Sequence, residues 1–221
     1  MPPRHADTRG GSAQARRIMF HNIIWDMGGT MVDTYPHVDA TLQAVVLDSG
    51  QEVSLLEVAR LTRRSTNLAI TELSRRFGIP EAEFREREQD LKDSWKITPP
   101  PAMAHVHEVL AAVPGINVVV THRDRASART LLDGLNLRVA DMVCPEDGFP
   151  RKPDPAMFTH MLNKHRLDRA RTLAIGDRPI DITTAHKVGV AGALLETPGI
   201  ELEADADYRI TDLSEVLPLL G

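Results

Sequence analysis

The chain has 221 residues, of which 42% are hydrophobic and 26% charged, so it can form one large domain or a core with a smaller insert. Its net charge of −5 comes from acids and bases mixed along the chain, which excludes the clustered basic surface of a nucleic-acid-binding protein. The single cysteine, Cys144, excludes an internal disulfide, and no apolar run reaches transmembrane length. We therefore expect a cytoplasmic monomer or homodimer without nucleic-acid or membrane partners.

Residues 1–18 are polar and contain four arginines, and they lack the apolar core of a secretory signal. We predict that this segment is a disordered tail. Met19 comes directly before the first apolar run, so we expect the folded protein, and its translation start as well, to begin near Met19.

The first half of the chain combines one strand with a long helical stretch. Residues 19–25 end in the apolar run Ile23-Ile24-Trp25, which predicts a buried strand, and Tyr35-Pro36 breaks the chain soon afterwards. From residue 37 to about 97, apolar residues recur at helical spacing without a strand pattern. We predict helices over residues 37–49, 55–77 and 81–95, and a stiff linker at Pro99-Pro100-Pro101.

Helices and strands alternate after this linker. We predict strands over residues 116–120, 141–144, 172–175, 192–195 and 208–210. We predict helices over residues 103–113, 126–135, 155–166, 180–188 and 212–220, the last one capped by Asp212. Such alternation implies a parallel sheet with helices on both faces, and functional sites in these sheets lie at the carboxyl ends of the strands.

Polar side chains stand at the ends of three predicted strands. The first strand ends at Asp26, and the turn that follows contains Gly28 and Gly29. An Asp held by such a turn can act as a nucleophile or a metal ligand, although the same pattern also occurs in a plain strand-capping turn. Thr121 and Asp177 end two later strands. Because these carboxyl ends meet at one edge of a parallel sheet, we expect the three residues to converge.

The chain carries four short motifs in a recognisable order. They are Asp26-x-x-x-Thr30, Thr121 at a strand end, Lys152-Pro153, and Gly176-Asp177-x-x-x-Asp181. This set resembles the motifs of the haloacid dehalogenase-like (HAD) hydrolase superfamily, and the resemblance runs from about Phe20 to the C-terminus. It implies an α/β fold whose core is a three-layer, Rossmann-like parallel sheet made of residues 19–35 and 99–221. Residues 36–98 would be an all-helical cap inserted after the first motif.

The resemblance implies a nucleophile and a metal site. Asp26 would attack phosphorus and form an aspartyl phosphate. Mg²⁺ would relieve the repulsion between the two anions, held by the Asp26 carboxylate, the Asp177 carboxylate and the Gly28 carbonyl. Asp181 would bind the metal through water or orient Asp177, and a simpler role as an acid at a helix N-terminus is equally open.

The resemblance also implies the phosphate-binding residues. Thr121 would donate its hydroxyl to a phosphate oxygen, and Lys152 would neutralise phosphate charge and hold Asp26. His122, directly after Thr121, is a further candidate for binding phosphate. Thr30 and Asp33 would fix the loop that follows the first strand.

Gly28 departs from the family pattern, which places a second Asp at this position. In family phosphatases that Asp protonates the leaving oxygen and then deprotonates the attacking water, and such assistance is worth roughly 10²–10⁴-fold in rate. Three explanations are open. The substrate has a leaving group that departs without a proton, another group such as His122 or Asp124 replaces the acid, or the protein binds phosphate ligands with little turnover.

These observations predict a Mg²⁺-dependent phosphatase that acts on a small phosphorylated metabolite through Asp26. The alternative is a catalytically weak protein that binds or senses a phosphate ligand on the same scaffold. A phosphonoacetaldehyde hydrolase-like activity is disfavoured because it needs a cap lysine, and the cap has only Lys92 and Lys96, both at its end. A metal-free dehalogenase is disfavoured by the retained pair Asp177 and Asp181.

Overall fold

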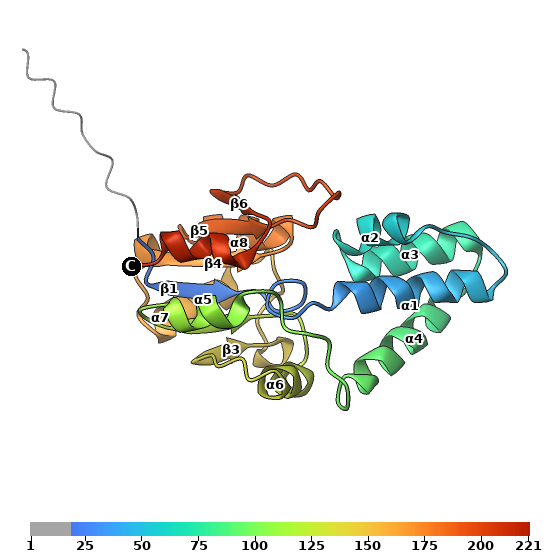
Figure 1. Cartoon of the computed structure of the whole chain (residues 1–221), viewed down its shortest axis with the longest axis horizontal. Coiled ribbons are helices and arrows are strands. Elements are labelled where there is room, and N and C mark those ends of the chain that lie inside the picture. Colours follow the sequence, from blue (N-terminus) through green and yellow to red (C-terminus); the bar gives the residue numbers. More distant parts are fainter. Residues whose placement is uncertain (1–18) are drawn as a thin grey trace, which may run out of the picture.

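The computed structural model describes residues 19–221 (Figure 1). The predicted tail over residues 1–18 lies outside this range. Within it, six parallel strands form one sheet in the order β3-β2-β1-β4-β5-β6. The strands are β1 (Asn22–Trp25), β2 (Asn117–Val120), β3 (Asp141–Val143), β4 (Thr172–Gly176), β5 (Ala191–Leu195) and β6 (Tyr208–Ile210). The chain order reverses between β1 and β4, and the α/β fold predicted from the alternation is confirmed.

Helices cover both faces of this sheet and make the core a three-layer structure. Ile23 and Trp25 of β1 pack with α5 (Val106–Ala112), α6 (Arg125–Gly134) and the 3₁₀ helix η3 (Leu213–Leu219). Ile24, which points to the opposite face because strand side chains alternate, packs with α7 (Ala156–Lys164) and α8 (Pro179–Lys187). Two short 3₁₀ turns, η1 (Pro145–Asp147) and η2 (Arg169–Arg171), complete the connections.

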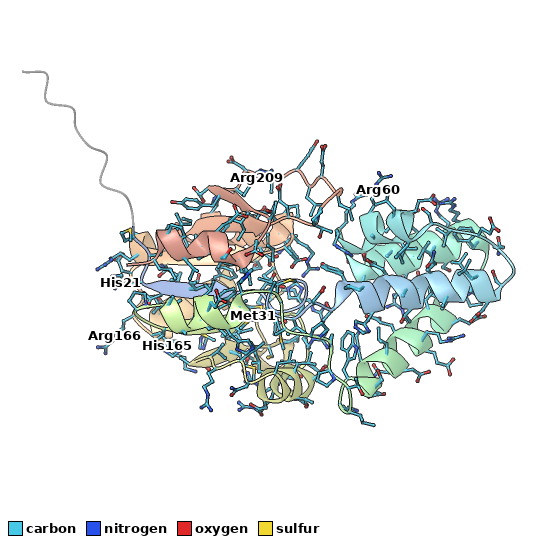
Figure 2. All side chains as sticks on the ribbon, in the orientation of Figure 1. His21, Met31, Arg60, His165, Arg166 and Arg209 are labelled. Atoms are coloured by element: carbon cyan, nitrogen blue, oxygen red, sulfur yellow. The ribbon has the colours of Figure 1, made fainter. Side chains whose placement is uncertain are left out.

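Residues 35–98 lie to one side of the sheet, and their only regular elements are helices; we call them the helical block (Figure 1). Its helices are α1 (Tyr35–Asp48), α2 (Leu55–Thr62), α3 (Thr66–Phe77) and α4 (Glu81–Ser94). α1 packs against the other three, and Leu42, Ile70 and Phe84 are fully buried among them. On the sheet side, Arg60 of α2 (Figure 2) and Thr197, in the loop after β5, line one hollow between the block and the sheet.

Three predicted helices need correction. The stretch over residues 55–77 is two helices, because Ser65 caps a new helix by accepting the N–H of Leu68. The helix predicted from residue 103 begins at Val106, after His105 adopts a left-handed φ of 61°. The final helix is a 3₁₀ helix containing Pro218, which has no N–H to give to an α-helical ladder. The cap at Asp212 is confirmed by its bond from the N–H of Ser214.

The other predicted elements are observed with boundaries shifted by up to three residues. No helix within residues 19–221 combines the length and the apolar character that crossing a membrane requires.

Candidate active site

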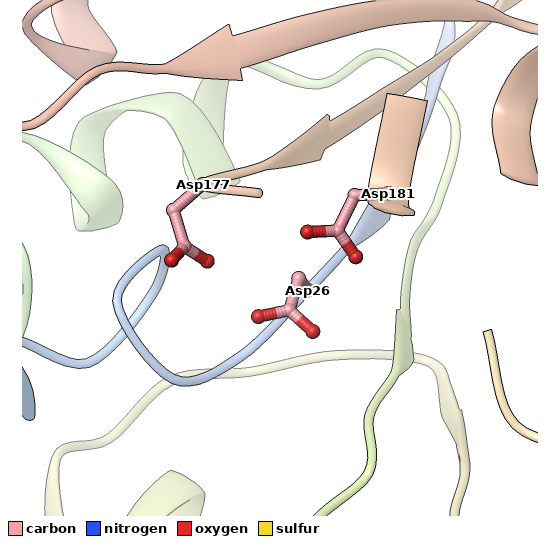
Figure 3. A group of neighbouring side chains, drawn as sticks. All are labelled: Asp26, Asp177 and Asp181. Atoms are coloured by element: carbon pink, nitrogen blue, oxygen red, sulfur yellow. The ribbon is translucent and has the colours of Figure 1, made fainter. Parts of the chain in front are cut away.

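Three carboxylates meet where the chain order of the sheet reverses. Asp26 follows β1, Asp177 follows the neighbouring β4, and Asp181 lies in the first turn of α8 (Figure 3). One oxygen from each lies within 4.8 Å of the other two, and all three side chains are buried. The expected convergence of Asp26 and Asp177 is therefore observed.

Lys152 bridges two of these carboxylates. Its Nζ donates to Oδ1 of Asp26 at 2.5 Å, to Oδ1 of Asp181 at 2.6 Å and to the carbonyl of Val120 at 3.1 Å. Burial opposes its charge, but Asp181 and Asp26 outweigh burial and raise the pKa of Lys152. All three ammonium protons are thus engaged, and the cation is held in one orientation.

The same contacts keep the candidate nucleophile ionised. Burial alone would raise the pKa of Asp26, but the positive charges of Lys152 and Arg178 outweigh it and lower that pKa. Within residues 19–221, only Oδ1 of the two Asp26 carboxylate oxygens accepts a hydrogen bond. Oδ2 therefore remains free for attack or for a metal.

Both oxygens of Asp177 accept hydrogen bonds. The hydroxyl of Thr30 donates to Oδ1 at 3.0 Å, and the hydroxyl of Tyr35 donates to Oδ2 at 2.5 Å. Burial raises the pKa of Asp177 to about 7, and the neighbouring carboxylates Asp26 and Asp181 act in the same direction. The sequence predicted only that Thr30 would help to fix the loop after β1. The contacts of Thr30 and Tyr35 with Asp177 join residues 147 and 142 positions apart, and neither was expected.

The donor set fits a hard divalent cation such as Mg²⁺. Carboxylate oxygens are the ligands that Mg²⁺ prefers, and three of them lie in one cluster. Burial, together with repulsion between the carboxylates, raises the pKa values of Asp177 and Asp181, and a bound cation would offset both effects. Oδ2 of Asp181 accepts the N–H of Arg178 at the start of α8, which is the contact expected of an acid at a helix N-terminus. Its Oδ1 accepts from Lys152, and no hydrogen bond among the described residues joins Asp181 to Asp177.

The turn after β1 needs one glycine but not two. Gly29 has a φ of 81°, and a Cβ there would lie 2.2 Å from the Tyr35 ring, so only glycine fits. Gly28 has no left-handed φ, and the nearest atom to a Cβ would be Oγ1 of Thr34 at 3.5 Å. The backbone at position 28 therefore accepts a side chain, and the missing acid is not a consequence of the turn.

Neither predicted substitute for that acid is a free proton donor. Nε2 of His122 accepts the backbone N–H of Lys152 at 2.9 Å. Burial, together with Lys152 and Arg178, lowers the pKa of His122 to about 4, so its ring is neutral at pH 7 with its proton on Nδ1. Asp124 caps α6 by accepting the N–H of Ser127 at 2.8 Å.

A cleft of about 420 Å³ opens over Asp26 between the sheet edge and the helical block. The core contributes Asp26, Gly28, Thr121, His122, Arg123, Asp124, Pro145, Arg151 and Arg178, and the helical block contributes Ser65, Thr66, Asn67, Glu88 and Lys92. Basic side chains outnumber acidic ones in this lining, and the volume suits a small ligand. The cleft is therefore suited to a small anion.

Several of these lining residues were not singled out from the sequence, among them Arg178 and Arg123. Arg178 stands at a variable position of its motif, and its Nε has no hydrogen-bond partner among the described residues. Burial opposes its charge, but Asp26 and Asp177 outweigh it and raise its pKa. Arg123 follows Thr121 in sequence and lies 5.0 Å over the ring of Trp95, at the end of α4. No pattern along the sequence separates either arginine from surface arginines.

Comparisons with known proteins agree with this geometry. The sequence profile of the haloacid dehalogenase-like hydrolases matches residues 23–194. Phosphoglycolate phosphatase of Rhodospirillum rubrum is 28% identical over 186 residues, covering 76% of each chain. N-acetylmuramic acid 6-phosphate phosphatase of Pseudomonas putida is 27% identical over 77% of this chain and 80% of its own.

A solved structure shares the fold. The HAD family hydrolase of Deinococcus radiodurans, crystallised with bound phosphate and sodium, aligns with a TM-score of 0.75 and 19% identity over 92% of this chain and 98% of that one. The chain belongs to the haloacid dehalogenase-like hydrolase family. Its family makes it a hydrolase, and the relatives described above are named phosphatases.

Proposed function

We propose that this protein is a Mg²⁺-dependent, cytoplasmic phosphatase of small phosphorylated metabolites, with Asp26 as nucleophile and the helical block as a cap over the cleft. The observation that carries this proposal is the contact between Lys152 and Asp26. It neutralises one oxygen of a buried, ionised carboxylate and leaves the other free. A carboxylate in this state can attack phosphorus.

The reaction would have two steps. Oδ2 of Asp26 attacks phosphorus, and the bond from phosphorus to the leaving oxygen breaks with its electron pair on that oxygen. Water then attacks phosphorus, and Asp26 leaves as a free carboxylate with inorganic phosphate as product. Asp26, Asp177 and the Gly28 carbonyl would hold Mg²⁺, which neutralises charge between nucleophile and phosphate.

Other residues of the cleft would bind the phosphoryl group. The hydroxyl of Thr121 accepts the N–H of Arg123 at 3.1 Å, so its proton is available for a phosphate oxygen. The Nδ1–H of neutral His122 is a second donor, and Arg178 supplies positive charge in the cleft. Lys152 does not line the cleft and supplies positive charge through its contact with Asp26. Asp181 would keep Lys152 in place through its 2.6 Å contact.

The leaving group decides which substrates suit the site. Gly28 cannot protonate the leaving oxygen, and His122 and Asp124 are engaged as described above. Glu88 of the helical block is paired with Lys92 at 2.7 Å. These contacts favour substrates whose leaving group departs as a stable anion, such as acyl or aryl phosphates.

A carboxylated phosphate ester is a further candidate substrate. Several relatives are named phosphoglycolate phosphatases, and four basic side chains line the cleft against three acidic ones. The basic side chains of the cleft favour phosphoglycolate because it carries a carboxylate as well as a phosphate. Gly28 disfavours it because its leaving group is an alkyl oxygen, which departs poorly without a proton. Gly28 also favours the second candidate function, a phosphate-ligand binder with little turnover.

The test is a panel of acyl, aryl and alkyl phosphates and phosphonates, assayed with Mg²⁺. We expect phosphate release that is fastest for acyl and aryl phosphates and is lost in Asp26→Asn. Binding of these compounds without release would instead support the phosphate-binding protein. Release that survives in Asp26→Asn would contradict the assignment of the nucleophile.

A further inference from the structure

Tyr35 connects the helical block to the carboxylate cluster. It is the first residue of α1, yet its hydroxyl donates to Oδ2 of Asp177, which follows β4 in the sheet. The two oxygen atoms lie 2.5 Å apart, and the Tyr35 side chain is buried. One side chain of the helical block therefore reaches a residue that would hold the metal.

Arg63 holds the Tyr35 ring in place. Its guanidinium carbon lies 3.6 Å from the ring centroid, a cation–π distance. Nη1 of Arg63 donates to Oδ2 of Asp39 at 2.8 Å, and this ion pair is buried on both sides. The Tyr35 ring is thus held by an arginine whose own orientation is fixed by Asp39.

Arg63 also reaches the core. Its Nε donates to Oγ1 of Thr197, in the loop after β5, at 3.1 Å. The contact from Tyr35 to Asp177 and the contact from Arg63 to Thr197 both join the helical block to the sheet domain. Both contacts therefore depend on the position of the helical block relative to the sheet domain.

The Asp177 carboxylate is oriented from two sides. Thr30 holds Oδ1 from the loop after β1, and Tyr35 holds Oδ2 from the helical block. A carboxylate with one donor on each oxygen still has lone pairs for a cation. Partners of this kind, behind a metal ligand, typically change metal affinity or activity by roughly 10–100-fold when removed.

We propose that Tyr35 is a positioning residue that orients Asp177 for a divalent cation. Through its contacts with the Tyr35 ring and Thr197, Arg63 makes this orientation depend on the position of the helical block relative to the sheet domain. This inference rests on the proposed metal site at Asp26 and Asp177. It adds that the helical block contributes to cation affinity as well as covering the cleft.

The test is the Mg²⁺ dependence of Tyr35→Phe, which removes the hydroxyl and keeps the ring. We expect two Mg²⁺ midpoints to increase by roughly 10-fold or more: the apparent dissociation constant fitted to the rise in Tm, and the concentration that gives half of the maximal activity. Tyr208→Phe is the matched control, because it removes the same hydroxyl from a tyrosine of β6 that packs edge-on against Phe20. This variant should leave both midpoints unchanged.

A second variant tests the role of Arg63 and covers the case in which Tyr35→Phe does not fold. Arg63→Lys keeps a positive charge and the Tyr35 hydroxyl but removes the planar guanidinium from the ring, and it should shift both midpoints in the same direction. A wild-type midpoint in folded Tyr35→Phe would overturn the positioning role alone. If Mg²⁺ changes neither Tm nor activity in the wild type, the metal site of the proposed function fails together with it.

Discussion

Lys152 and Asp26 lie 126 positions apart in the chain, and their side chains meet at 2.5 Å in the buried centre of the site. The contact follows from the sheet topology. Asp26 comes directly after β1, and Lys152 donates to the carbonyl of Val120, the last residue of the neighbouring strand β2. The contact between Lys152 and Asp26 explains how a carboxylate with almost no exposure stays ionised.

Mg²⁺ should stabilise the native state, because the carboxylate cluster repels itself without a cation. At 100 times its dissociation constant, a ligand that binds only the native state adds about 2.7 kcal/mol to the free energy of unfolding. We expect Tm to rise on adding Mg²⁺ and fall on chelation, and we expect Asp177→Asn to lose most of this response. Equal Tm and turnover with and without a chelator would favour a metal-free, dehalogenase-like mechanism.

Gly28→Asp should speed the hydrolysis of alkyl phosphates. Charge builds on the leaving oxygen in the transition state, and an acid at position 28 would neutralise it. The backbone there accepts a Cβ, so the variant should fold. We expect kcat/KM for alkyl phosphates to rise by roughly 10²-fold, with little change for aryl phosphates.

Gly28→Asn is the control for this experiment, because it has nearly the same size as Gly28→Asp but offers no acid. It should leave the dependence of rate on leaving-group pKa as steep as in the wild type. The account of Gly28 is wrong if the wild type already hydrolyses alkyl and aryl phosphates equally fast.

His122 should make the protein less stable in mild acid. Its pKa is lowered from 6.5 to about 4 on folding, so between these pH values the unfolded chain binds a proton that the native state does not. The His122 contribution therefore lowers the free energy of unfolding as pH falls from 6.5 to 4. His122→Gln should show a weaker loss of stability over this window in denaturant titrations, and an unchanged pH slope would mean that His122 is not held neutral.

The ion pair of Arg63 and Asp39 should be costly to break, because both side chains are buried. Removing one partner of such a pair leaves an uncompensated charge, which typically costs about 3–5 kcal/mol. Arg63→Met should lower the free energy of unfolding by this amount, whereas the double variant with Asp39→Leu should recover part of the loss. Arg75→Met, which breaks the exposed pair with Glu72, should change stability little.

The sheet and the motif residues could be predicted from the sequence because each depends on local patterns. Apolar runs mark strands, and the polar residues that end β1, β2 and β4 meet because parallel strands share an edge. Tyr35 and Arg178 could not be found in this way, because their roles depend on contacts with residues far along the chain. The break at Ser65 was missed because apolar spacing continued across it.

The central claim is that phosphate passes through a covalent bond to Asp26. The most direct measurement is mass spectrometry of peptides after acid quenching of the enzyme during turnover of an aryl phosphate. We predict one phosphoryl group on the peptide that contains Asp26, and none on that peptide from Asp26→Asn. Turnover without any phosphoryl adduct at Asp26, or an adduct on another residue, would contradict the account.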